Sequence, residues 1–126
     1  MNKPKEPTMF NLTDKNIKLE RTEPMRISYV PTEENLNVNG TMHGGVMFFL
    51  ADDLMGRWVT AKGWTGAAAD AEIHYYVPAL PGERIFATID ERKVGRRLGV
   101  LQVEITNEAG KRIADAVFTL AFASAK

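Results

Sequence analysis

Asp52 is the residue whose type and setting most clearly suggest chemistry. It stands in an otherwise apolar run, and a helix would place it among these residues on its own face: Phe48, Phe49, Met55 and Gly56. Burying a carboxylate is costly unless it is paired, or solvated within a site. A catalytic carboxylate is therefore one interpretation of Asp52. The other is that Asp52 faces solvent or forms an ion pair with an arginine such as Arg57.

Gly44-Gly45 could supply a second part of an acyl-transfer site. At the start of a helix the backbone N–H groups are unpaired and the helix dipole is positive. A carbonyl oxygen that becomes negative in a transition state would be stabilised there, and glycine removes side chains from its path. The alternative is that the paired glycines only allow a tight turn from a loop into the helix.

Other catalytic arrangements have little support in the sequence. Asp53 would lie about 100° around a helix from Asp52, so the two carboxylates could not act on one face, and Asp53 is expected to be structural. The serines, Ser28 and Ser124, are not in a Gly-x-Ser-x-Gly turn. The sequence has no cysteine, and its 2 histidines have no glutamate at metal-ligand spacing, so neither a thiolate nucleophile nor a metal site is expected.

One helix, from about His43 to Lys62, is expected to carry both features. Its apolar side chains cover nearly the whole circumference: Val46, Met47, Phe49, Leu50, Leu54, Met55, Trp58 and Val59. A helix that is apolar all round is buried on every side. Gly63 is a natural stop just beyond it. In a chain of this size, a sheet must enclose such a helix.

The rest of the sequence predicts that sheet. Met25 to Val30 alternates as a first strand, and residues 67 to 77 alternate as a half-buried strand with His74 on its exposed side. Further alternating strands are expected near residues 85–89, 101–105 and 114–122. The predicted fold class is α+β, in which one long buried helix is wrapped by a curved antiparallel sheet of about five strands.

Size and composition predict one domain and exclude several classes of function. We expect a polar N-terminal arm at residues 1–20 and one domain at residues 21–126. Lysine plus arginine number 16, as do aspartate plus glutamate, and this balance argues against nucleic acid as a partner. With no signal peptide and no apolar run of about 18 residues, we expect no membrane association and a cytoplasmic location.

Three segments form a spaced set across the chain. The first is Asn37 to Gly45 (NVNGTMHGG), followed by Phe48 to Asp52 (FFLAD). The others are Ala71 to Ala79 (AEIHYYVPA), leading to PGE, and Gly110 to Ala114 (GKRIA). Together they resemble PaaI-type hotdog thioesterases of the 4-hydroxybenzoyl-CoA thioesterase superfamily, over roughly residues 25 to 123. The resemblance implies the hotdog fold and hydrolysis of acyl-CoA thioesters with an aryl or medium-chain acyl group.

The resemblance also implies roles for single residues. Asp52 would be the general base or the nucleophile. The Gly44 N–H would polarise the thioester carbonyl, and Asn37 would position water or substrate. His43 and Gly45 would line the substrate site beside them. No cofactor is implied, because coenzyme A is part of the substrate.

This sequence departs from the family at the start of its long strand. Many relatives carry serine or threonine there, whereas this chain has Ala68. Ala68 would line the substrate site without the hydroxyl that helps to hold the attacking water. Its presence implies slower turnover, a different water contact, or binding without catalysis. The basic stretch of Lys93, Arg96 and Arg97 would contact the phosphates of coenzyme A, or else form a solvated turn.

Helix geometry predicts self-association. Gly44 and Asp52 are eight residues apart, which is about 12 Å along a helix axis. A thioester carbon must lie within about 3–4 Å of both the oxyanion donor and the attacking group. Antiparallel helices in a two-fold dimer could meet this condition, so we expect a dimer or a dimer of dimers. Two other functions stay open: a non-catalytic acyl-CoA-binding or sensing protein, and a hotdog dehydratase, for which no second acid or histidine is placed.

Overall fold

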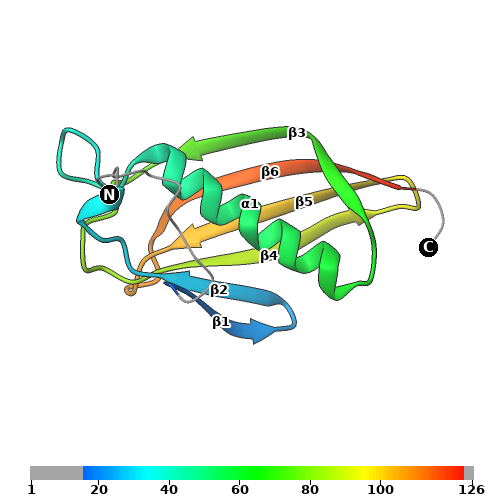
Figure 1. Ribbon diagram of the computed structural model, residues 1–126, viewed down its shortest axis with the longest axis horizontal. Helices are drawn as coiled ribbons and strands as arrows, with labels where there is room; N and C mark the ends of the chain where they lie inside the picture. Colours follow the sequence, from blue (N-terminus) through cyan, green and yellow to red (C-terminus); the bar gives the residue numbers. More distant parts are fainter. Residues whose placement is uncertain (1–15, 124–126) are drawn as a thin grey trace, which may run out of the picture.

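The computed structural model describes residues 16–123. In chain order these form β1 (Ile17–Thr22), β2 (Met25–Tyr29), a short 3-10 helix η2 (Glu33–Asn35), α1 (Gly44–Ala61), β3 (Gly66–Tyr75), β4 (Ile85–Val94), β5 (Leu98–Thr106) and β6 (Arg112–Phe122). The strands make one antiparallel sheet in the order β1-β2-β4-β5-β6-β3 (Figure 1). The α+β class is confirmed, although the described residues form six strands rather than about five.

The additional strand is β1, whose residues 17–20 fall within the predicted N-terminal arm of residues 1–20, so the sheet begins earlier than the predicted boundary. Only Ile17 of its six residues is buried, so its sequence lacks the apolar alternation that would reveal a strand. β1 is held instead by its hydrogen bonds to β2, which the sequence does identify as a strand. Residues 1–15 of the predicted arm lie outside the described residues.

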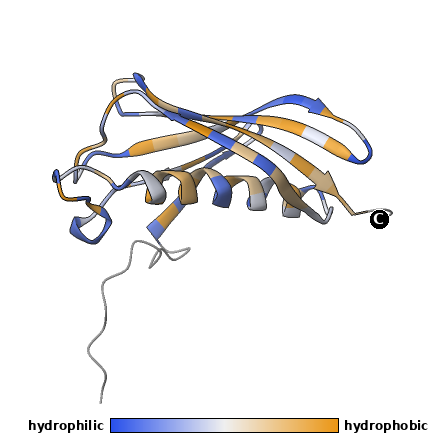
Figure 2. Ribbon diagram, turned by 90° about the horizontal axis from the view of Figure 1, so that it is seen from above, coloured by the Kyte–Doolittle hydropathy of each residue, from blue (hydrophilic) through white to orange (hydrophobic). Residues whose placement is uncertain are grey.

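Helix α1 lies across the concave face of the sheet (Figures 1 and 2). Leu50 and Leu54 are fully buried against the sheet, and each contributes about 1.5–3 kcal/mol by leaving water. The prediction of a helix buried on every side is wrong for the single chain, because the sheet covers only one side of it. Asp52, Gly56 and Thr60 form an exposed stripe on successive turns.

Strand β3 forms one edge of the sheet, next to β6. The sequence predicted a half-buried strand, but all of its residues except Gly66 and Ile73 are exposed on the single chain. A bulge interrupts the pairing, since Ala68 lies opposite Leu120 whereas Asp70 lies opposite Thr119. β3 is therefore an edge that the single chain leaves uncovered.

Candidate active site

The carboxylate of Asp52 has no hydrogen-bond partner within residues 16–123. Its neighbour Asp53 is paired with Arg57, at 2.7 Å from Oδ2 to Nε. This ion pair confirms the structural role predicted for Asp53 and leaves Asp52 without Arg57 as a partner. The other half of the alternative holds for the single chain, on which the Asp52 side chain is exposed to solvent. Partial desolvation of this otherwise exposed side chain, and secondarily the charge on Asp53, raise the pKa of Asp52 above its ordinary value.

Asp52 lines a cavity of about 490 Å³ between the second half of α1 and the start of β3. On the α1 side the lining continues through Met55, Gly56, Val59 and Thr60. The remaining lining residues come from the loop after α1, from β3 and from β6: Trp64, Thr65, Gly66, Ala67, Ala68 and Leu120. The lining combines apolar side chains with the polar groups of Asp52, Thr60 and Thr65, so the cavity offers apolar contact to a ligand whose reacting end meets a carboxylate.

The β3 bulge determines which alanine faces this cavity on the helix side of the sheet. Residues directly opposite each other in an antiparallel pair share a face. Ala68 and Ala71 lie opposite Leu120 and Phe118, both of which are buried in the core. Simple alternation would have grouped Ala71 with Ala67 and Ala69 instead. The bulge therefore places Ala68 in the cavity with Asp52, at the position where the resemblance implied a missing hydroxyl.

The start of α1 leaves one backbone donor open. His43 caps the helix: its Nδ1 accepts from the Gly45 N–H at 2.9 Å, and its carbonyl oxygen accepts from the Val46 and Met47 N–H groups at 3.0 and 3.1 Å. Within the described part of the chain, the Gly44 N–H has no partner. Of the two glycines, Gly44 is thus the one able to donate to an oxyanion. Because Nδ1 of His43 is an acceptor, the ring proton is on Nε2.

Tyr75, which the sequence analysis did not single out, holds this helix start from β3. Its hydroxyl donates to the carbonyl oxygen of Gly44 at 2.8 Å. A Cβ on Gly44 would lie 3.1 Å from both the Cζ and the hydroxyl oxygen of Tyr75. Gly44 does not have a positive φ, so close approach of Tyr75, rather than a tight turn, is what requires glycine here. No sequence signal marked this role, because Tyr75 reads as one more strand residue.

Asn37 organises the loop that leads into α1. Its Oδ1 accepts from the Asn39 N–H at 2.9 Å, from the Thr41 N–H at 3.2 Å and from the Thr41 hydroxyl at 3.3 Å. The carbonyl side of its amide is therefore occupied by the loop. Any contact of the Asn37 side chain with water or substrate falls to its amide nitrogen.

The basic residues Lys93, Arg96 and Arg97 lie at the β4–β5 hairpin and are exposed. This hairpin is at the end of the sheet toward which α1 runs (Figure 1). The backbone carbonyl of Arg97 accepts from the Phe122 N–H at 2.8 Å. The hairpin is thus anchored beside the end of β6, on the side of the molecule where the cavity lies.

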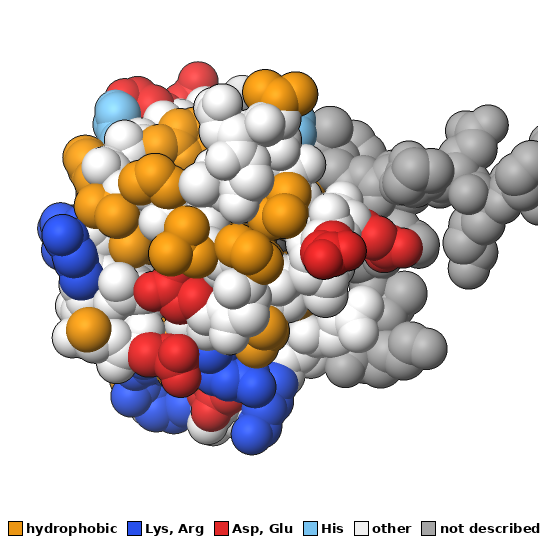
Figure 3. All heavy atoms as spheres, turned by 90° about the vertical axis from the view of Figure 1, so that its left-hand side faces the viewer, with side chains coloured by type: hydrophobic (Ala, Val, Ile, Leu, Met, Phe, Trp, Pro, Cys, Tyr) orange, Lys and Arg blue, Asp and Glu red, His pale blue; other side chains and the backbone are white. Residues whose placement is uncertain are grey.

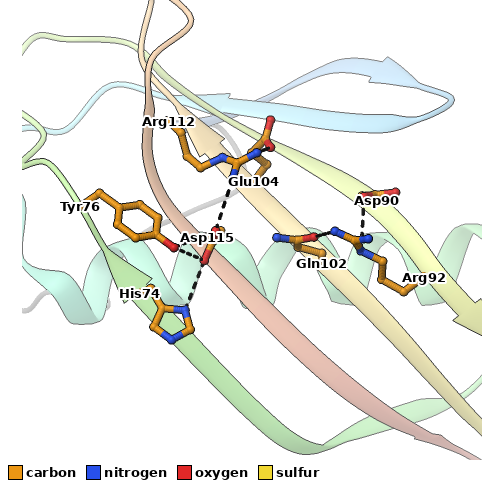
Figure 4. Close-up of polar contacts among 8 residues, drawn as sticks. All are labelled: His74, Tyr76, Asp90, Arg92, Gln102, Glu104, Arg112 and Asp115. Carbon is orange, nitrogen blue, oxygen red and sulfur yellow. Dashed lines mark hydrogen bonds and ion pairs between the residues drawn. The ribbon is translucent and has the colours of Figure 1, made fainter.

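A second polar cluster lies on the outer face of the sheet (Figure 4). Asp115 accepts from the Tyr76 hydroxyl at 3.0 and 3.1 Å, and it lies 3.3 Å from Nδ1 of His74. Arg112 joins Asp115 to Glu104. Further along the same face Arg92 contacts Asp90 and Gln102. His74 is half-exposed, as its strand position predicted.

This cluster is separate from the cavity, because the β6 neighbours of Asp115, Ala114 and Ala116, face the core. Among residues 16–123, no group of histidine, aspartate and glutamate side chains is arranged to hold a metal ion. In the same range, no helix has the length and apolar character needed to cross a membrane.

The part of the chain that carries these features matches a known protein family. The model of the thioesterase superfamily matches residues 39–114, which include Gly44, Asp52 and Ala68. The chain belongs to the thioesterase superfamily. Its hotdog fold is shared with the PaaI protein of Escherichia coli, whose structure aligns with a TM-score of 0.77 at 25% identity over 81% of this chain and 74% of that one.

Other members of the superfamily are similar in sequence or structure. Human acyl-coenzyme A thioesterase 13 is 40% identical over 85 residues, which cover 65% of this chain and 61% of that protein. The matched region thus spans less than two thirds of this relative's length. A hypothetical thioesterase from Streptococcus pneumoniae TIGR4, solved with coenzyme A, aligns with a TM-score of 0.81 at 25% identity over 86% of this chain and 89% of that one.

In this thioesterase-superfamily chain, the predicted site residues fall into three groups. Asp52 and Ala68 share the cavity. The second group lies at or before the start of α1: Asn37, His43, Gly44 and Gly45. The third is the β4–β5 hairpin with its basic side chains. Within one chain, the first two groups are separated by about 12 Å along the helix axis.

Proposed function

We propose that this chain hydrolyses acyl-CoA thioesters to a free acid and coenzyme A. The observation that carries the proposal is the unpaired carboxylate of Asp52 at a cavity that also presents apolar side chains, in a chain of the thioesterase superfamily. Two similar proteins, of Homo sapiens and Escherichia coli, are named acyl-coenzyme A thioesterases, and the Streptococcus pneumoniae structure contains coenzyme A. These relatives support a CoA thioester as the substrate.

In the proposed reaction Asp52 activates water. Its carboxylate takes a proton as the water oxygen bonds to the thioester carbon, and the raised pKa of Asp52 makes it a stronger base than an ordinary aspartate. The carbonyl oxygen becomes negative and accepts from the Gly44 N–H. The C–S bond then breaks, and the leaving thiolate of coenzyme A receives the proton from Asp52. Direct attack by the Asp52 carboxylate would release the coenzyme A thiolate and form a mixed anhydride, again with the Gly44 N–H as donor to the carbonyl oxygen. Water would then hydrolyse the anhydride, releasing the free acid and restoring Asp52.

A complete site requires two copies of the chain, since Asp52 and Gly44 of one chain are too far apart for one thioester carbon. A two-fold pair with antiparallel helices would bring Asp52 of one copy to Gly44 of the other. The exposed edge β3 supports such pairing, because an open strand edge offers unpaired backbone groups to a second chain. Apolar side chains also gather on the face where β3 ends and α1 begins (Figure 3). Exposed large apolar residues close in sequence to these two ends are Val38, Tyr75 and Leu80.

The phosphates of coenzyme A would be bound by the exposed hairpin cations Lys93, Arg96 and Arg97. Three positive side chains within five residues offer a diphosphate several charge-assisted hydrogen bonds. A cytoplasmic location, where acyl-CoA is available, stays a prediction from the sequence.

Thiol release from a panel of acyl-CoAs tests the proposal. With octanoyl-CoA we expect free coenzyme A and octanoic acid to appear in equal amounts. With O-acetylserine, an oxygen-ester control, we expect no release of acetate. The second candidate function is acyl-CoA binding without turnover, and the observation that favours it is Ala68 in the cavity. Tight binding of octanoyl-CoA with no thiol release across the panel would replace hydrolysis by that function.

A further inference from the structure

Gly56 stands in the interior of α1 without a structural requirement for glycine. A glycine in a helix interior costs about 0.5–1 kcal/mol relative to alanine. The φ of Gly56 is not positive, and a Cβ built on it would meet nothing within 4 Å. What glycine does at this position is leave space, and that space belongs to the cavity one turn beyond Asp52.

The cavity follows one stripe of α1. Asp52, Gly56 and Thr60 are spaced four residues apart and all line it, so it extends about 12 Å along the helix from the carboxylate. A zigzag carbon chain with bonds of about 1.5 Å advances about 1.25 Å per carbon. Because the thioester carbon would lie about 3 Å from the carboxylate, a linear chain of about eight to ten carbons would span the rest of the cavity. A phenylacetyl group, about 6 Å long by the same bond lengths, would reach only as far as Gly56.

Trp64 lines the cavity just beyond the last turn of α1. It follows Gly63, which ends the helix with a positive φ of 77°. The Trp64 ring packs edge-on against Trp58, at 5.7 Å between centroids, and against Phe122, at 5.3 Å. Trp58 is in turn held by a hydrogen bond of 3.0 Å from its Nε1 to Glu91.

The rings of Trp58, Trp64 and Phe122 form an aromatic wall, and two further glycines make room for it. A Cβ on Gly66 or on Gly99 would lie 3.0 Å from the Phe122 ring. The ring of Phe122 therefore rests on β3 and β5 at once, and it supports Trp64 from the sheet side. The wall is built from packed rings on α1, on β6 and in the loop after α1, rather than from a single side chain.

We propose that the cavity binds a linear, saturated acyl chain of about eight to ten carbons, with Gly56 admitting the chain and Trp64 limiting its length. The proposal rests on the proposed hydrolysis of acyl-CoA at Asp52. The lining of Met55, Val59 and Leu120 supplies apolar contact along the chain. Gly56 and Trp64 are specificity-determining residues in this account, and neither takes part in the chemistry.

The test is kcat/KM for butyryl-, hexanoyl-, octanoyl-, decanoyl-, tetradecanoyl- and phenylacetyl-CoA. In the wild type, kcat/KM should rise about three- to fourfold per added methylene up to eight to ten carbons, and then level off or fall. Gly56→Leu should lower the ratio of kcat/KM for octanoyl-CoA to that for butyryl-CoA by at least about tenfold, with little change in kcat/KM for butyryl-CoA. Trp64→Ala should move the maximum of kcat/KM to longer chains. Ala61→Leu, on an exposed α1 position outside the cavity, is the matched control and should leave the length profile unchanged.

Three results would overturn the proposal. One is that Gly56→Leu lowers kcat/KM equally for all chain lengths, or no longer self-associates in size-exclusion chromatography. Either outcome would mean that Gly56 serves the contact between copies of the chain. Another is a preference for phenylacetyl-CoA. The third is a flat length profile in an active wild type, which would leave hydrolysis standing. If Gly56→Leu does not fold, Gly56→Ala should raise Tm and reduce the octanoyl-to-butyryl ratio.

A wild type that hydrolyses no acyl-CoA would refute the proposed function instead. The cavity is then tested by equilibrium binding of the same series to wild type and Gly56→Ala. Affinity that grows with chain length only in the wild type supports the assignment of Gly56, and affinity independent of length contradicts it.

Discussion

At the scale of single residues, two adjacent aspartates differ in what surrounds them. Asp53 forms an ion pair with Arg57, whereas Asp52 has no partner within residues 16–123 and has a raised pKa. The sequence could separate the two, because helix geometry put them on different faces. The same geometry favours Asp53 as the partner of Arg57, because these two residues are four apart whereas Asp52 and Arg57 are five apart.

The raised pKa of Asp52 predicts the pH dependence of turnover. A general base acts only when deprotonated, so activity should be lost as pH falls through a pKa above the ordinary aspartate value of about 3.9. Asp53→Asn removes the smaller of the two causes and should move this acid limb to lower pH without abolishing activity. A profile of kcat/KM against pH measures both effects. An acid limb that stays at the same pH in Asp53→Asn would show that Asp52 is not the group that titrates.

Ala68 makes a second prediction at this scale. A hydroxyl at this position would face the cavity beside Asp52 and could hold the attacking water, so Ala68→Ser should raise kcat several-fold with little change in KM. Ala69→Ser is the control, because Ala69 is the unpaired bulge residue and does not line the cavity. A slower Ala68→Ser enzyme would mean that another group holds the water.

At the scale of elements, the start of α1 is clamped from two sides. The His43 side chain accepts from the Gly45 N–H, and the Tyr75 hydroxyl donates to the Gly44 carbonyl oxygen. These two groups belong to the same peptide unit, which is therefore fixed at both ends beside the open Gly44 N–H. An oxyanion donor is effective when it is held in place before the reaction. The clamp links the edge strand β3 to the catalytic end of the helix.

Tyr75→Phe should therefore lower kcat by up to about tenfold, the equivalent of one lost hydrogen bond, with KM nearly unchanged. Tyr76→Phe removes a hydroxyl that binds Asp115 on the outer face of the sheet, and we expect it to leave kcat close to that of the wild type. Steady-state kinetics of both variants, with Tm as a check on folding, makes the comparison. Equal effects of the two substitutions would contradict a positioning role for Tyr75.

Elements were predictable from the sequence where burial is periodic and not elsewhere. The apolar run and Gly63 located α1 to within a residue at each end. The sequence missed β1, whose single buried residue makes no pattern. It also missed the β3 bulge, which reverses the parity of Ala68. Family resemblance located Ala68 correctly, because it compares positions rather than periodicity. The Tyr75 contact depends on β3 packing beside the helix start, and no local pattern encodes that.

At the scale of the whole molecule, the exposed features of one chain are those that a second copy would cover. Edge β3, the open stripe of α1 and the apolar face at the start of α1 are all uncovered (Figures 1 and 3). Half of the proposed site lies on each side of such a contact. Helix length alone allowed this prediction from the sequence, while the contact surface itself required the fold.

Mixed dimers test whether the site is shared. Asp52→Asn and Asn37→Ala should each be inactive, the second because Asn37 holds the loop that leads to Gly44. When equal amounts are refolded together, half of the dimers are mixed and one of their two sites is free of both lesions, so activity should recover to roughly a quarter of wild type. If subunit exchange is demonstrated and no activity returns, Asp52 and the Gly44 side act within one chain.

The central claim, that Asp52 is the catalytic carboxylate of an acyl-CoA thioesterase, is tested most directly by the turnover of octanoyl-CoA in Asp52→Asn beside Asp53→Asn. The two substitutions remove the same charge from neighbouring positions of α1, so they separate catalysis from general electrostatics. We predict that Asp52→Asn lowers kcat at least about a hundredfold while the Kd for octanoyl-CoA changes little, and that Asp53→Asn keeps most of its turnover. Undiminished thiol release by Asp52→Asn, or an equal loss in both variants, would contradict the claim.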